Sequence, residues 1–175
     1  MDVGERLDYL RQLTNSYQKK ARKERPTWQQ LSAANKWLHW EEVLEVVKVQ
    51  HETMESQVKP ALRAPESQKY TVLLLYCAVP PGRAQEYRTL KVQLGTTPHQ
   101  PTTGTENIMH YGPQTILELG SFKNRENFGL QVIDISHIEF LVSHLGDYIK
   151  KDRPILLKSN TDHGFLFMVR WLQQF

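Results

Sequence analysis

The chain of 175 residues contains very little cysteine, because Cys77 is the only one. A single cysteine excludes a disulfide framework and a cysteine-based zinc site, and it suits a reducing, intracellular compartment, either cytoplasm or nucleus. Cys77 lies in an apolar run, where a thiolate is disfavoured, so we expect no catalytic cysteine. The seven histidines include no pair spaced as metal ligands on one helix. We therefore expect no metal site.

Long apolar runs are also missing, since none approaches the ~18 residues that a membrane-spanning helix needs. The N-terminus lacks the basic-then-apolar order of a secretory signal, and we expect no membrane partner. The nine glycines are scattered. They form neither a glycine-rich phosphate loop nor a Gly-x-Ser-x-Gly nucleophile motif.

The composition is that of a folded chain, with 39% hydrophobic and 23% charged residues and a formal net charge of +3. Residues 1–25 hold seven basic and four acidic side chains, so the remainder of the chain is neutral overall. The positive charge gathers at the end of a predicted helix, at Lys19, Lys20, Arg22, Lys23 and Arg25. Two interpretations stay open: a patch that contacts nucleic-acid phosphates, or a solvated helix end whose cations favour the helix dipole.

Apolar residues at three- and four-residue spacing predict helices over residues 1–25, from about Thr27, and from Leu38 to about Gln57. A connection follows over Lys59–Pro65. The apolar run Tyr70–Val79 fits either a buried strand or a buried helix. Further helical patterns cover Arg83–Leu90 and His137–Lys150, the latter capped by Ser136 and turning Ile138, Phe140, Leu141, Leu145 and Ile149 inward. A last amphipathic segment covers Phe165–Phe175.

Strand patterns are fewer. Ile116–Leu119 and Leu130–Ile135 alternate in part, with a polar hairpin connection between them. Residues 94–114 have no periodicity and read as a long loop, with room for one short strand. The order predicts an α+β fold that is mainly helical, with a small antiparallel β-hairpin or sheet.

Two positions have side chains suited to phosphate chemistry. Arg83 follows the breaker Pro80-Pro81-Gly82, and its guanidinium suits bidentate contact with a phosphate. Glu86 lies three residues further along, on the same side of the predicted helix, where it can hold Arg83 in place. Lys123 lies at the tip of the predicted hairpin, where it can contact DNA or donate a proton. The alternatives are a surface Arg–Glu pair and an ordinary solvated turn lysine.

Four segments in this order resemble the tyrosine recombinase (phage-integrase-like) family, in its eukaryotic and viral branch associated with Crypton-type transposons. The resemblance rests on Trp37–Val43 as the start of a catalytic domain, on Pro81-Gly82-Arg83-Ala84-Gln85-Glu86 as a G-x-R-x-x-E motif, on Phe122-Lys123-Asn124 in a hairpin, and on Tyr148, Ile149, Arg153, Leu156 and Leu157. It covers residues 37–175 as a partial catalytic domain. Residues 1–30 would be a helical segment that fits the end of a core-binding domain.

The resemblance implies DNA strand cleavage and rejoining through a 3′-phosphotyrosine, without a cofactor. Arg83 would be the first catalytic arginine and would stabilise charge on the phosphate, and Lys123 would be the general acid. Glu86 would support Arg83. Arg88 and Lys91 would join the basic cluster of residues 19–25 in contacting DNA. The implied partners are DNA and other recombinase subunits or a completing chain, in the nucleus if the source is eukaryotic.

The sequence departs from the family in one large respect. It contains no His-x-x-Arg motif, and none of its seven tyrosines follows such a motif. We therefore expect a truncated site and no strand cleavage by this chain alone, since the members of a catalytic set act as a unit. Two further hypotheses stay open: a domesticated, non-catalytic DNA-binding module, and an unrelated helical module for protein interaction.

Overall fold

The computed structural model describes residue 15 and residues 28–33, 38–79, 83–95, 104–123, 125–158 and 161–168. Its contacts divide the chain into two units, Met1–Leu44 and Glu45–Phe175. In the first unit, α2 spans Trp28–Ala33 and α3 begins at Trp40, where the His39 backbone N–H donates to Glu42 Oε2 at 2.6 Å. The helix predicted over residues 1–25 lies, except for Asn15, outside the described residues.

The second unit begins within α3 (Trp40–Glu55), which ends close to the predicted Gln57, and continues into α4 (Pro60–Ala78). The apolar run from Tyr70 is therefore helical. The predicted connection over Lys59–Pro65 is wrong, because α4 already begins at Pro60. A proline is tolerated at the first helical position, whose N–H has no partner within the helix. Ala64 is fully buried, so packing holds this first part of α4 in place despite Pro65.

Four strands form one sheet in the order β1-β2-β3-β4: β1 (Leu90–Leu94), β2 (Asn107–Tyr111), β3 (Ile116–Leu119) and β4 (Gln131–Asp134). β1 pairs with β2 in parallel, and the other two pairs are antiparallel. The fold is thus α+β as predicted, but the sheet is mixed and the expectation of a purely antiparallel sheet is wrong. The error has one physical source, since a parallel partner lies far away in the chain and leaves no local turn signal.

The helix predicted over Arg83–Leu90 is shorter in the structure, because α5 (Ala84–Arg88) ends before β1 starts at Leu90. Residues 94–114 were predicted as a long loop that could include one short strand, and β2 is that strand. The polar connection between β3 and β4 contains a single helical turn, α6 (Arg125–Phe128). These elements bring α5 and the end of β3 close to the start of β2, where the candidate site lies.

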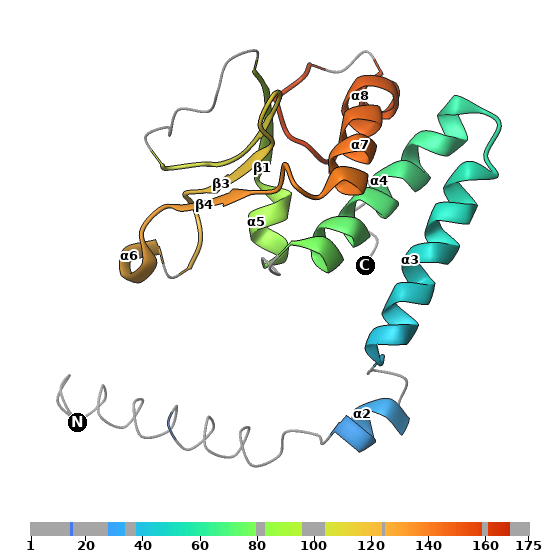
Figure 1. The fold of residues 1–175 in the computed structure, drawn as a ribbon, viewed down its shortest axis with the longest axis horizontal. Coiled ribbons are helices and arrows are strands. Elements are labelled where there is room, and N and C mark those ends of the chain that lie inside the picture. The colour runs from blue at the N-terminus through green and yellow to red at the C-terminus, as the bar shows by residue number, and fades with distance from the viewer. Residues whose placement is uncertain are drawn as a thin grey trace, which may run out of the picture. The chain divides into compact units, whose positions relative to one another are not determined.

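The core lies between one face of the sheet and the helices α4, α7 (Glu139–Asp147), the π-helical turn η1 (Tyr148–Asp152) and α8 (Arg153–Leu157) (Figure 1). Alternate strand residues face these helices, as the pleat requires. The sheet contributes Leu90, Met109 and Leu117, and the helices contribute Leu74, Leu75, Leu141, Leu145, Tyr148 and Ile149.

The helix predicted from His137 is confirmed as α7, with two corrections. Ile138 is its N-cap, whereas the Ser136 hydroxyl accepts a hydrogen bond from the Thr115 backbone N–H at 2.9 Å. Phe140 is 60% exposed and does not face the core. Residues 161–168 run beside β1, with Leu166 N–H donating to Leu90 O and Val92 N–H to Gly164 O, both at 2.7 Å. The described helices include none that is long and apolar enough to cross a membrane.

Candidate functional site

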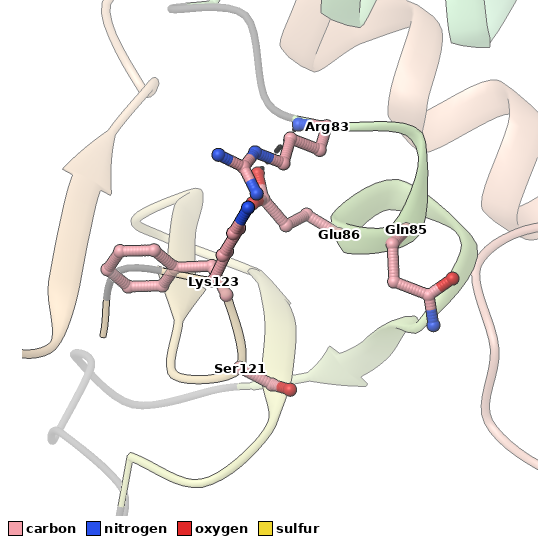
Figure 2. Close-up of a pocket in the computed structure, with 6 residues that line it drawn as sticks. Arg83, Gln85, Glu86, Ser121 and Lys123 are labelled. Carbon is pink, nitrogen blue, oxygen red and sulfur yellow. Dashed lines mark hydrogen bonds between the residues drawn. The ribbon is translucent and has the colours of Figure 1, made fainter. Parts of the chain in front are cut away.

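Arg83 and Lys123, far apart in the sequence, line one pocket of about 310 Å³ (Figure 2). The other lining residues are Gln85, Glu86, Ser121 and Phe122. One wall comes from the start of α5 and the other from the loop that follows β3. The fold therefore brings together the two cationic side chains and the carboxylate that the sequence singled out.

The α5 wall is fixed by Glu86, which is 8% exposed. Glu86 Oε2 accepts a hydrogen bond of 2.7 Å from the backbone N–H of Arg83. A carboxylate in this position satisfies one of the N–H groups left open at a helix start. Glu86 thus holds Arg83 through the main-chain N–H of Arg83. The Arg83 side chain itself is exposed.

The Lys123 wall is fixed by backbone contacts around Gly120. The Gly120 N–H donates to Glu106 O at 2.9 Å. The Arg125 guanidinium donates to Gly120 O at 3.2 Å and to Gly104 O at 3.3 Å. These bonds tie the loop to the chain that leads into β2, while Lys123 stays exposed at the pocket.

Asn107, the first residue of β2, joins the two walls. Its amide nitrogen lies within hydrogen-bond distance of Thr89 Oγ1 at 2.9 Å and Glu86 O at 3.3 Å on the α5 side. On the loop side the same nitrogen lies 3.0 Å from Ser121 O, and Asn107 Oδ1 accepts from Ser121 N–H at 2.9 Å. Asn107 was not predicted as a site residue, because an asparagine in a Gly-, Pro- and Thr-rich stretch is typical of a turn.

The remaining predicted DNA contacts fall into two groups. Arg88 is exposed on α5, whereas the Lys91 ammonium forms an ion pair with the Glu106 carboxylate. Lys91 therefore presents a partly neutralised charge to a ligand. The predicted basic cluster lies outside the residues that the structure describes. It consists of Lys19, Lys20, Arg22, Lys23 and Arg25.

Tyr148 and Cys77, two side chains that could act as nucleophiles, do not line the pocket. Tyr148 is fully buried, and its hydroxyl lies 3.0 Å from Gln68 Oε1 and 2.9 Å from Leu166 O. Burial raises the pKa of Tyr148 well above its ordinary value, so its phenolate is disfavoured. Burial also raises the pKa of Cys77. Over the part of the chain that the structure describes, no three His, Cys, Asp or Glu side chains gather as metal ligands.

The chemistry of the pocket follows from its lining. An exposed guanidinium and an exposed ammonium suit an anion with several oxygens, and a guanidinium can bind two oxygens of one phosphate. Ser121 and Gln85 add polar groups and Phe122 adds an aromatic ring. The lining of the pocket is therefore chemically suited to a phosphate group.

Comparisons of the chain with protein-family models, with curated proteins and with solved structures found no match. The resemblance to tyrosine recombinases stays a prediction that rests on the motifs quoted above. The functional proposal depends on the site itself.

Proposed function

We propose that this protein binds DNA and that the pocket between α5 and the β3–α6 loop holds a phosphodiester of the backbone. The observation that supports the proposal is the convergence of Arg83 and Lys123 on one pocket. Both are exposed cations fixed on well-bonded backbone, and phosphate contacts of this kind supply most sequence-independent affinity for DNA.

In this proposal Arg83 binds the non-bridging phosphate oxygens and Lys123 approaches the same phosphate from the opposite wall. The arrangement corresponds to the roles that the recombinase resemblance implies for these two residues. Residues 1–175 nevertheless contain no His-x-x-Arg motif. Tyr148 is fully buried in the core, so its hydroxyl is not available for attack on a phosphate. We therefore expect this chain to bind DNA without cleaving it.

Fluorescence anisotropy with a labelled DNA duplex, titrated at several salt concentrations, tests the proposal. We expect Arg83→Ala and Lys123→Ala each to weaken binding by roughly threefold to tenfold and to reduce the salt slope by about one. Lys150→Ala is the matched control, because it removes the same charge from an exposed lysine that does not line the pocket. Equal losses of DNA affinity in all three variants would show that only the net charge of the protein matters. That result would overturn the proposed site.

A DNA substrate with a nick that traps covalent intermediates tests the second half of the proposal. We expect no protein–DNA adduct from residues 1–175. A trapped adduct would show that the chain contains its own nucleophile. Absence of any salt-dependent DNA binding would instead favour a module for protein interaction.

A further inference from the structure

Asn107 occupies a position from which it cannot touch a ligand in the pocket. It is 1% exposed and is not among the lining residues. Its amide nevertheless contacts both walls, through Glu86 and Thr89 on α5 and through Ser121 on the loop. Two of the lining residues, Glu86 and Ser121, are its direct partners, and Gln85 and Phe122 are next to them in the chain.

We infer that Asn107 is a positioning residue that sets the spacing between Arg83 and Lys123. The inference about DNA affinity rests on the proposed function, whereas the inference about spacing concerns the free protein. A site that must hold two cations on one phosphate needs its side chains supported by packing and by hydrogen bonds from residues behind them. Asn107 provides that support to both walls at once.

An amide is the one side-chain group of this size that can both donate and accept hydrogen bonds, as the contacts with the two walls require. Its two N–H groups donate to carbonyl and hydroxyl oxygens, and its carbonyl accepts from the Ser121 N–H. A carboxylate of the same shape keeps the acceptor but loses both donors. It would also place a negative charge against Glu86 O and Ser121 O. Asn107→Asp therefore removes every bond that the amide donates, and repulsion from Glu86 O and Ser121 O moves the carboxylate away and weakens the bond from Ser121 N–H, with almost no change of volume.

Amide hydrogen exchange in the free protein tests the positioning directly. We expect Asn107→Asp to accelerate exchange at Ser121 and in the last turn of α5, and to leave Leu117 and Leu145 unchanged. Gln68→Glu is the matched control, because it converts another buried amide, one that contacts Tyr148 and Met168. That variant should affect exchange near Met168 and leave Ser121 unchanged. Acceleration at one wall only, or throughout the chain, would overturn the inference.

Thr89→Val provides a second test of the same connection if the Asn107→Asp variant does not fold. It removes one hydroxyl partner of the Asn107 amide and keeps the shape of the side chain. We expect a smaller acceleration of exchange at Ser121 in this variant, although Thr89 itself does not contact Ser121 in the described hydrogen bonds. An unchanged Ser121 amide would contradict the connection through Asn107.

A double-mutant comparison of DNA affinity tests the consequence for binding. We expect Asn107→Asp to weaken binding about as much as Lys123→Ala, by roughly threefold to tenfold. The double variant, Asn107→Asp with Lys123→Ala, should bind DNA no more weakly than whichever single variant binds more weakly. The losses of binding free energy are not additive when one residue acts through the other. Gln68→Glu should bind as the parent protein does. A merely structural role of Asn107 would give independent, additive losses.

The two experiments separate the two proposals. If the parent protein shows no salt-dependent DNA binding, the proposed function fails, and the exchange data alone decide whether Asn107 joins the walls. If the parent binds DNA and Asn107→Asp binds equally well, the proposed function stands and the positioning role is overturned.

Discussion

Asn107 and Ser121 exchange two hydrogen bonds, one in each direction. The Asn107 amide donates to Ser121 O at 3.0 Å, and Ser121 N–H donates to Asn107 Oδ1 at 2.9 Å. β3 ends at Leu119, so these bonds imitate the pairing of a strand beyond the point where the sheet stops. The Asn107 side chain therefore orders the backbone at Ser121, in the loop that contains Lys123.

Gly120 is required for this loop to lie where it does. A Cβ on Gly120 would come within 2.3 Å of Gly104 O and 2.7 Å of Glu106 O. Both contacts are with backbone, which cannot move aside as a flexible side chain can. We expect Gly120→Ala to lower the free energy of unfolding by about 2 to 3 kcal/mol, measured by urea denaturation.

Gly129→Ala is the comparison for that prediction. Gly129 has φ of +68°, and a Cβ there would meet no atom within 4 Å. The substitution therefore costs backbone strain alone, about 1 kcal/mol. A loss for Gly120→Ala that does not exceed the loss for Gly129→Ala would show that the loop shifts freely, and that the Lys123 wall is not rigid.

The stability of the fold should fall on mild acidification because of His144. Its Nε2 lies 2.8 Å from Thr71 Oγ1, and the Thr71 hydroxyl donates to Ser67 O, so Nε2 is the donor of a neutral imidazole. Burial lowers the pKa of His144 from 6.5 to about 4. Below pH 6.5 the unfolded chain binds a proton that the folded chain does not bind. The free energy of unfolding is thus highest above pH 6.5 and decreases as the pH falls toward 4.

We expect this effect to remove about 2 kcal/mol between pH 7 and pH 5, since one pKa unit corresponds to about 1.4 kcal/mol. Urea denaturation of the parent protein and of His144→Gln at both pH values measures it. Glutamine keeps a donor near the position of Nε2 but does not titrate. Equal pH dependence in the two proteins would assign the acid sensitivity to other groups.

The ion pair of Arg63 and Asp152 should contribute much more to stability than the exposed pairs. Arg63 Nη1 lies 2.8 Å from Asp152 Oδ1 and 2.7 Å from Oδ2, and the Asp152 side chain is 3% exposed. We expect Asp152→Asn to lower the free energy of unfolding by about 3 kcal/mol, because the partly buried Arg63 guanidinium then keeps only the exposed Glu55 carboxylate as its counter-charge.

Asp147→Asn is the matched control for Asp152→Asn. Asp147 pairs with Lys151 at 2.8 Å, but the two side chains are 51% and 66% exposed. Water screens that pair, so we expect a loss below about 0.5 kcal/mol. Thermal or urea denaturation of both variants decides the point, and similar losses would contradict the role assigned to burial.

Tyr148 should behave as a structural residue. Tyr148→Phe removes the hydroxyl that lies near Gln68 Oε1 and Leu166 O, and we expect a loss of about 1 to 2 kcal/mol in unfolding free energy. DNA affinity should not change, because Tyr148 does not line the pocket. A DNA adduct formed by the parent protein and lost in Tyr148→Phe would show the opposite, that this tyrosine reacts.

Local patterns predicted α3, β3 and β4 well. The dipole-favouring Glu41 and Glu42 and the valines that follow them predicted α3, and partial alternation predicted β3 and β4. They failed where long-range packing decides. α4 starts at Pro60 because Ala64, Ser67 and Gln68 pack in the interior, and β1 forms because β2 pairs with it across a long connection. Neither partner is visible in a local window.

The sequence by itself determined which side chains are chemically suited to phosphate contact. Arg83 follows a rigid break, Lys123 follows a strand in a polar turn, and Cys77 lies in an apolar run. Only the tertiary structure decided that Arg83 and Lys123 line one pocket, that Glu86 acts on the backbone of Arg83, and that Asn107 joins the two walls. The physical reason is that chemical identity is a property of each residue, whereas distance across the chain is set by the pairing of β1, β2 and β3 and by the core beneath them.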